Sequence, residues 1–441
     1  MNFIKRIIGL FILLVILSGV VWGGVYYYKH SPKLLSLKTS YKTVEENDLY
    51  VRFDMEAYDK IAENYWMKTK ESDLVGLFQL SLQKTQNLGT LPALASTTRA
   101  GVAKMLFDAI NLATSTDAKK NLALGVLNVA LYNLAPAGRD GLLSSIQQKQ
   151  LQQEVTNVNP EKDLYKDLGV AKGAPTSEVE TAYIEKKEEL TKIATPEAKV
   201  ELEKVTYAHQ VLTDKNNKNL YDQAQIEPTV WKHVIGKTLY LSMSKISPNT
   251  LQEFAKIIDG ASTTPGLDSM ILDLRGNIGG ALDFAPAFIG LFIGPNQYAF
   301  DLFHQDEYKP QRSTIGKYPE LSRFADIAII TDNMTQSTAE VITAMFKRFN
   351  LGHVVGTNTR GWGTVENTFP IDTVIDSNEK YTMLLVQYLT LREDGQPIDG
   401  RGVDPHVNIN DKSWKTQVSK TFKSQSLVDA VLKQAVKPPL R

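Results

Sequence analysis

The sequence predicts an α/β protein whose N-terminal half is helical. From about residue 228 onward, short apolar runs bounded by turn residues alternate with segments of helical periodicity, as in layered α/β domains. Residues 50–155 instead repeat apolar side chains at helical spacing, with Pro and Gly between the repeats. A long uncharged run, Ile7 to Tyr28, precedes both parts. We therefore expect an N-terminal membrane helix, a helical part and an α/β part.

Composition limits the possible functions. The 441 residues suffice for two or three domains. Lys+Arg and Asp+Glu both number 49, so net charge gives no reason to expect a nucleic-acid partner. The absence of cysteine excludes disulfides, thiolate metal sites and cysteine catalysis. The six histidines show no metal-ligand spacing, and we expect neither a metal nor another cofactor.

Residues 1–33 predict a signal anchor. Lys5 and Arg6 precede the uncharged run from Ile7 to Tyr28, and about 20 apolar residues cross a bilayer as a helix. Trp22 and the tyrosines after it resemble an interfacial aromatic belt. A cleaved signal peptide is the alternative, although its apolar core is usually shorter. We expect a single-pass membrane protein whose N-terminus lies inside.

Residues 34–155 are interpreted as a polar stalk, reaching to about Asp48, followed by a helical domain. Apolar side chains recur at helical spacing in the first part of that domain, at Met55, Tyr58, Ile61 and Tyr65. No residue there suggests chemistry, so we predict a helical scaffold.

Residues 160–224 resemble a J-domain. The matching positions include Leu164, Tyr165, Leu168, Gly169, Val179, Tyr183, Val211, Leu212, Asp214 and Tyr221. J-domains act on a chaperone ATPase through a His-Pro-Asp loop, and the corresponding residues here are Thr191-Lys192-Ile193. We therefore predict a spacer, or a docking module for a partner protein, without co-chaperone activity.

Residues 228–412 are predicted to form the α/β core, and residues 413–441 to add a closing C-terminal helix. Met270 to Leu274 is an apolar strand that runs into the turn DLRGNIGG. Gly279 and Gly280 in that turn permit positive φ and a close approach of the backbone to a ligand.

A second turn, after the apolar run that ends at Thr331, carries Ser337. Helical periodicity begins directly after it, so Ser337 falls in the first turn of a helix. N–H groups there have no intrahelical acceptor, and they can hold an oxyanion beside a nucleophilic hydroxyl. The same position also suits an ordinary capping serine.

Together these turns resemble the C-terminal processing (tail-specific) serine peptidase family. The matching positions are Asp273, Leu274, Arg275, Asn277, Gly279 and Gly280, then Ser337 and Glu340, then Asp394, Gly395, Ile398, Gly400, Gly402, Val403 and Pro405. The resemblance implies a crotonase-like (ClpP/crotonase-type) core, polypeptide substrates and work outside the cytoplasm. It also implies that Ser337 is the nucleophile, and that the oxyanion hole combines the Thr338 N–H with that of Gly279 or Gly280.

One departure from the family affects catalysis directly. The family's general base is a Lys in Phe-Gly-Lys-Gly-x-Val-Gln, and the corresponding run here places Trp362 at the Lys and Glu366 at the Gln. An indole N–H is only a donor and cannot take a proton from serine. Ser337 is then inert, in a pseudopeptidase that still binds polypeptides, or Glu366 acts as the base through a raised pKa, or a base comes from elsewhere. The candidates for that last case, by residue type alone, are His304, Lys347 and His353.

Asp273 and Arg275 are expected to fix the glycine turn by ion pairing rather than to touch substrate. The sequence thus predicts a membrane-anchored extracytoplasmic serine endopeptidase. The alternative is a catalytically impaired pseudopeptidase that acts as a polypeptide-binding scaffold or as a regulator of another protease or of envelope assembly.

Overall fold

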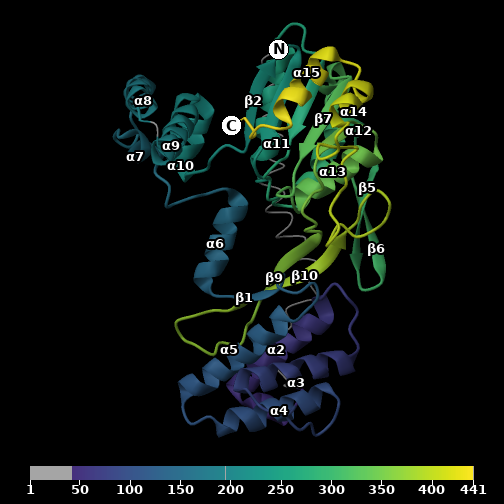
Figure 1. The fold of residues 1–441 in the computed structure, drawn as a ribbon. Helices are drawn as coiled ribbons and strands as arrows, with labels where there is room; N and C mark the ends of the chain where they lie inside the picture. Colours follow the sequence, from purple (N-terminus) through teal and green to yellow (C-terminus); the bar gives the residue numbers. More distant parts are fainter. Residues whose placement is uncertain (1–41, 194, 441) are drawn as a thin grey trace, which may run out of the picture.

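The computed structural model describes residues 42–193 and 195–440, which form three parts (Figure 1). A helical domain lies at the bottom of the view, an α/β core at the upper right and a four-helix module at the upper left. The predicted membrane helix of residues 1–33 and most of the predicted stalk lie outside the described residues. Within the described ranges, no helix has both the length and the hydropathy needed to cross a bilayer.

The core is built on a six-stranded sheet in the order β11-β8-β7-β4-β3-β2. All neighbouring strands are parallel except β2, which pairs antiparallel with β3. The strands span β2 (Val230–Ile235), β3 (Thr238–Met243), β4 (Ser269–Asp273), β7 (Asp326–Thr331), β8 (His353–Gly356) and β11 (Val407–Asn408). Because neighbouring parallel strands end at one edge of a sheet, the segments after β3, β4 and β7 meet there.

Helices cover both faces of this sheet. Leu239 and Leu241 of β3 pack with the helices of one face, whereas Tyr240 between them packs with those of the other. The first layer is α11 (Thr250–Ser262), α12 (Phe284–Ile293) and α13 (Thr338–Arg348), and the second is α14 (Trp414–Thr421) and α15 (Gln425–Gln434). This architecture confirms the predicted α/β core.

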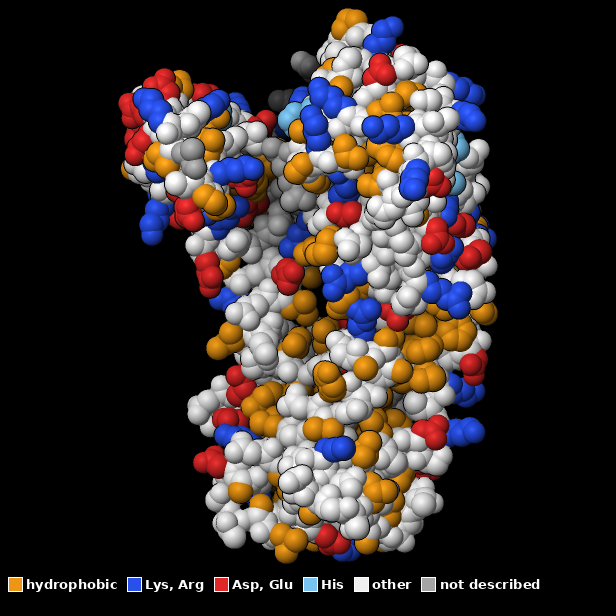
Figure 2. Space-filling view, viewed as in Figure 1, with side chains coloured by type: hydrophobic (Ala, Val, Ile, Leu, Met, Phe, Trp, Pro, Cys, Tyr) orange, Lys and Arg blue, Asp and Glu red, His pale blue; other side chains and the backbone are white. Residues whose placement is uncertain are grey.

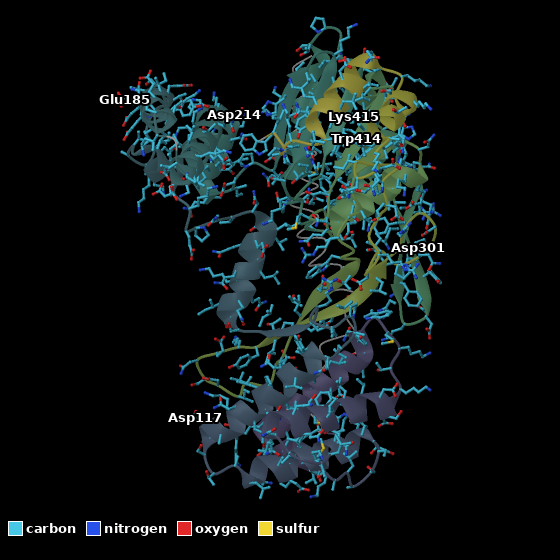
Figure 3. The ribbon with its side chains drawn as sticks, viewed as in Figure 1. Asp117, Glu185, Asp214, Asp301, Trp414 and Lys415 are labelled. Carbon is cyan, nitrogen blue, oxygen red and sulfur yellow. The ribbon has the colours of Figure 1, made fainter. Side chains whose placement is uncertain are left out.

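The C-terminal segment contains two helices where the sequence predicted one. In Figure 3, Trp414 and Lys415 lie together on α14; Trp414 is buried against the sheet and Lys415 is exposed. The chain then turns, and the Ser424 side chain accepts the Leu427 N–H to begin α15. The segment is therefore a layer of the core.

A second, antiparallel sheet connects the core to the helical domain. Its order is β1-β10-β5-β6, and β9 pairs with the other side of β10. The strands span β1 (Gly141–Leu143), β5 (Tyr298–His304), β6 (Glu307–Arg312), β9 (Thr364–Pro370) and β10 (Thr382–Thr390). The sequence predicted β10 alone among these strands. It also assigned residues 141–155 to the helical domain, but β1 joins this sheet and α6 (Ser145–Thr156) follows it as a separate helix.

The helical domain contains η1 (Val44–Asn47), α2 (Leu49–Asn64), α3 (Glu71–Gln86), α4 (Arg99–Leu112) and α5 (Thr116–Tyr132). Its apolar core also includes Met383 and Leu385 of β10, so it packs directly on the second sheet. The predicted stalk extends too far toward the C-terminus. Glu46 is buried and its carboxylate accepts Arg99 Nη1 at 2.7 Å, which makes the residues just before Asp48 part of the domain.

The four-helix module consists of α7 (Leu164–Leu168), α8 (Thr176–Thr191), α9 (Pro196–Thr213) and α10 (Lys215–Ala224). It has an apolar core of its own, in which Leu164, Tyr165, Leu168, Val179, Val211, Leu212 and Tyr221 are buried. Figure 3 labels Glu185 on α8 and Asp214 before α10. The fold of the module agrees with a helical domain, and the resemblance to a J-domain stays a prediction.

Candidate active site

The glycine turn after β4 is held by its own asparagine. Asn277 Nδ2 donates to the Met243 carbonyl at the end of β3, and Asn277 Oδ1 accepts the Gly279 N–H at 2.8 Å. Gly279 has φ +84° and Gly280 has φ +149°, values that side chains other than hydrogen rarely allow. A Cβ on Gly280 would lie 1.8 Å from the Ile246 carbonyl oxygen, so the segment after β3 presses directly against this turn.

Asp273 and Arg275 stabilise the glycine turn, as predicted. Arg275 Nη2 lies 2.5 Å from Asp273 Oδ2, and the Tyr240 hydroxyl donates to the same oxygen at 2.6 Å. Arg275 also donates to the carbonyls of Ala435 and Lys437, which ties the turn to the C-terminal segment. The pair is buried, so its role is structural.

The serine turn lies against the glycine turn. Ser337 is the N-cap residue of α13 and has φ 57°, ψ −129°, a strained conformation for a residue with a side chain. The Gln336 N–H donates to the Asn277 carbonyl at 2.9 Å. A Cβ built on Gly279 would lie 2.6 Å from Ser337 Cβ and 3.0 Å from its Oγ. The two turns therefore meet as predicted, and only glycine fits opposite the serine.

Two backbone N–H groups remain available beside Ser337. Within the described residues, no acceptor binds the N–H of Gly280 or of Thr338. The Thr338 hydroxyl donates to the Gly280 carbonyl at 2.7 Å, which couples the residues that carry these donors. The Gly279 N–H is occupied by Asn277, so of the two predicted glycine donors only Gly280 is free. This corrects the assignment of Gly279 as a donor; its role is to make room for Ser337.

Glu340 joins the serine turn to the loop that follows β8. Its buried carboxylate accepts four hydrogen bonds, from the N–H groups of Ser337, Gly361 and Trp362 and from the Thr359 hydroxyl, all at 2.6 to 2.8 Å. Burial raises the pKa of Glu340, and these four donors oppose the rise. One side chain thus sets the distance between Ser337 and the loop that carries Trp362.

Trp362 and Glu366 face each other across the start of β9. Trp362 Nε1 donates to Glu366 Oε1 at 3.1 Å, and the Thr364 hydroxyl donates to the same oxygen at 2.6 Å. The guanidinium carbon of Arg139 lies 3.4 Å from the centroid of the Trp362 ring. No hydrogen bond joins Glu366 to Ser337 anywhere in the described chain, which weakens its case as the base.

The three other base candidates do not line the site. His304 binds the Gln387 carbonyl in the second sheet. Lys347 is paired with Glu393 at 2.6 Å, and His353 packs against His406 and Phe422 behind the core sheet. Predicting a base by residue type alone was wrong for these three, because none of them shares the groove with Ser337.

A groove of about 750 Å³ opens above Ser337. Gly279, Gly280, Thr338 and Trp362 line it together with Ser337, and residues 364–368 of β9 form one side. Leu151, Glu154 and Val155 of α6 form the opposite side. Figure 2 shows the molecule hollowed between the core on the right and α6 with the four-helix module on the left, and basic and acidic side chains are interspersed on the face shown.

Comparison with known proteins decides the family. The profile of peptidase family S41 matches residues 237–409, which include both turns, Trp362 and β11. This part of the chain is an S41 peptidase domain. The resemblance to C-terminal processing peptidases that the motifs indicate is thereby confirmed.

Relatives of the S41 domain include a "Probable CtpA-like serine protease" of Staphylococcus aureus (strain N315), 29% identical over 192 residues, and one of Staphylococcus epidermidis (strain ATCC 12228 / FDA PCI 1200), 29% identical over 183 residues. These alignments cover 43% and 41% of this chain, but only 37% and 35% of the relatives. Similar solved structures include a lipoprotein from Streptococcus agalactiae (TM-score 0.46, 12% identity) and a photosystem II D1 C-terminal processing protease (TM-score 0.45, 12% identity). Each covers 84% of this chain, and the alignments span 96% and 94% of those chains respectively.

Sequence reasoning about the S41 domain missed Arg139 and Lys245. Arg139 reaches Trp362 from 223 positions away in the chain, and no local pattern signals such a contact. Lys245 follows β3 and lines the groove, and the strand pattern of the sequence could have indicated this position. Adjacent parallel strands end at the same edge, so the residues after β3 belong beside the turns after β4 and β7.

Proposed function

We propose that this protein is a serine-type endopeptidase that hydrolyses polypeptides through Ser337. The observation that carries the proposal is the meeting of the two turns: a strained serine at a helix N-terminus, in contact with Gly279, beside two backbone N–H groups without acceptors. Ser337 Oγ attacks a peptide carbonyl, and the carbonyl oxygen takes the negative charge between the N–H groups of Gly280 and Thr338. Preorganised donors of this kind stabilise the charge that develops in acyl transfer.

The groove supports a polypeptide as the substrate. Strand β9 is bonded to β10 along one side, and its residues Thr364, Val365, Glu366, Asn367 and Thr368 line the groove. A strand with an unpaired edge binds an extended peptide through main-chain hydrogen bonds, whatever the peptide's side chains. A carbonyl of such a peptide then reaches Ser337 in the same groove.

Labelling with a serine-directed fluorophosphonate tests this function. We expect the full chain to be labelled at one site, the Ser337→Ala variant not to be labelled, and a Ser419→Ala variant, changed on the outer surface of α14, to be labelled as the wild type is. A wild-type protein that is folded but takes no label would refute the proposal.

The second candidate is a polypeptide-binding protein without catalysis. It is favoured by Trp362, which occupies the position of the family's basic lysine and is held there by Arg139 on one face and Glu366 at its N–H. For this candidate we expect no labelling, together with binding of an unfolded polypeptide that an obstructing substitution such as Thr368→Trp in β9 abolishes.

We further propose that residues 1–33 anchor the protein in a membrane and that the peptidase domain faces outward. The uncharged run from Ile7 to Tyr28 supports the anchor, and the two basic residues before it support the orientation. We expect the protein in the membrane fraction of intact cells, and we expect added protease to degrade its globular part without lysis. Recovery in the soluble fraction, or protection until lysis, would contradict this arrangement.

A further inference from the structure

Lys245 is the lysine of the groove that Ser337 lines. The residue follows β3 and lines the same groove as Ser337 and Trp362. Its neighbour Ile246 donates its N–H to the Gly279 carbonyl at 2.9 Å, and Gly279 in turn contacts Ser337. The backbone that carries Lys245 is therefore fixed against the turn opposite the nucleophile.

The surroundings of Lys245 are unusual for a lysine. The side chain is half-buried, and across residues 42–193 and 195–440 its ammonium has no hydrogen bond or ion pair. Burial lowers the pKa of Lys245, and the carboxylates of Glu154 and Glu227 oppose that effect. Glu227 is itself engaged by Lys162 at 2.7 Å. An amine that is partly desolvated and unpaired is the form in which lysine acts as a base.

Other titratable groups of the groove suit this task less well. The Arg139 guanidinium is a hydrogen-bond donor only, Asp283 is exposed, and one Glu366 oxygen already accepts two hydrogen bonds. The charged or titratable groups that line the groove with Lys245, and the adjoining hollow beside α6, are Arg139, Glu154, Glu161, Tyr207, Glu227, Asp283 and Glu366. Among the titratable groups of the groove, Lys245 is the amine, and burial lowers its pKa.

We propose that Lys245 is the general base of Ser337 and replaces, from the β3 side of the groove, the lysine missing at position 362. This inference rests on the proposed function. The neutral amine takes the Ser337 hydroxyl proton while Oγ bonds to the peptide carbonyl carbon. When the intermediate collapses, the C–N bond breaks and the Lys245 ammonium returns that proton to the leaving amine. Water then adds to the acyl-serine and its proton passes to the neutral Lys245 amine. When the C–O bond to Ser337 breaks and the acid is released, Lys245 returns this proton to Ser337 Oγ.

The test compares the rates at which a fluorophosphonate labels the full chain and its Lys245→Met and Lys245→Arg variants. Methionine keeps the length of the stem without the amine, and arginine keeps the charge but cannot be deprotonated. We expect both variants to be labelled at least about 100-fold more slowly than the wild type, the usual contribution of a general base. Lys237→Met, at the exposed turn at the other end of β3, is the matched control and should leave the rate unchanged.

The pH dependence provides a second readout. The wild-type labelling rate should rise with pH, with a midpoint below the ordinary value for lysine, and Lys245→Arg should lose that midpoint. A wild-type rate in Lys245→Met, or in Lys245→Arg, would overturn the inference while Ser337 remained the labelled residue. If the wild type itself takes no label, the proposed function fails first, and the two failures are thereby distinguished. Thermal unfolding of each variant shows whether a slow rate comes from loss of the fold.

Discussion

The Glu340→Gln substitution tests how the site is held together. In the wild type, Glu340 Oε2 accepts the N–H groups of Ser337 and Trp362, both at 2.8 Å. Oε1 accepts the Thr359 hydroxyl at 2.6 Å and the Gly361 N–H at 2.7 Å. Glutamine has almost the same shape, but one of its two acceptor atoms becomes an NH₂ group. The substitution therefore changes hydrogen bonding without opening a cavity.

The size of the effect follows from which oxygen is replaced. An NH₂ group in place of Oε2 would face two backbone N–H donors and leave both without an acceptor. In place of Oε1 it faces only the Gly361 N–H, since the Thr359 hydroxyl can turn and accept from it. Glutamine will take this second orientation. One buried N–H without an acceptor costs about 1–3 kcal/mol, and losing the charge from the other bonds adds to this, so we expect about 2–4 kcal/mol.

Urea unfolding of the full chain measures this loss, and the labelling rate of Ser337 in the absence of urea measures its effect on the site. Labelling should slow as well, because the loop after β8 loses its bond from the Gly361 N–H and the remaining bonds to the serine turn lose the carboxylate charge. Glu307→Gln makes the same atomic change on exposed β6 and should shift the free energy of unfolding by less than about 0.5 kcal/mol. If Glu340→Gln were as stable as Glu307→Gln and were labelled at the wild-type rate, the role assigned to this carboxylate would be wrong.

Three further substitutions test other parts of the site. Gly279→Ala places a methyl group 2.6 Å from Ser337 Cβ, and we expect labelling to fall at least about 10-fold and stability by about 1–3 kcal/mol, measured by labelling and urea unfolding. Burial raises the pKa of Asp140 to about 7, so the stability that its protonation contributes is present at low pH and is lost as the pH rises through 7. Between pH 5 and pH 8, the free energy of unfolding of the wild type should therefore fall by about 2 kcal/mol more than that of Asp140→Asn. Equal pH profiles of the two proteins would contradict this. Arg139→Gln removes the cation stacked on Trp362 and should cost about 1–2 kcal/mol and change the tryptophan fluorescence, whereas an unchanged spectrum would mean that the stack does not hold the indole.

The fold was predictable where burial dominates the sequence. Strand β4 is buried along its whole length and its middle residues, Met270 to Leu272, are apolar, so the strand was found. Hairpin β5–β6 was missed because its turn residues, Gln305 and Asp306, have φ 49° and 68° without the glycine that usually marks such a turn. Strand β9 is polar and partly exposed, and its pairing with β10 is what makes it a strand. Local pattern carries no information about a pairing partner.

The residues of the site also fall into those that the local sequence predicts and those that it does not. Ser337 and the glycines were predictable because a sharp turn needs particular residues at fixed local spacing, and the structure brings these residues into contact. Arg139 was not found because it reaches the groove through tertiary packing alone, whereas Lys245 was missed although its place directly after β3 was a signal. The four bonds accepted by Glu340 were also hidden, because three of the donors are backbone N–H groups that any residue other than proline supplies.

These backbone bonds are consistent with the proposal that Trp362 occupies the family's lysine position, because they hold Ser337 whatever side chain stands at position 362. The loop after β8 is held to Glu340 by the backbone of Gly361 and Trp362 and by one threonine hydroxyl, so the side chain at position 362 contributes nothing to that anchoring. The proposed exchange of lysine for tryptophan at this position would remove a base but leave Ser337 and the neighbouring N–H donors in position. The indole then serves a structural purpose, since it carries the guanidinium of Arg139 and so connects the segment before β1 to the groove. A base supplied from β3 needs no change in any of these contacts, because Lys245 reaches the groove from the other side of the glycine turn.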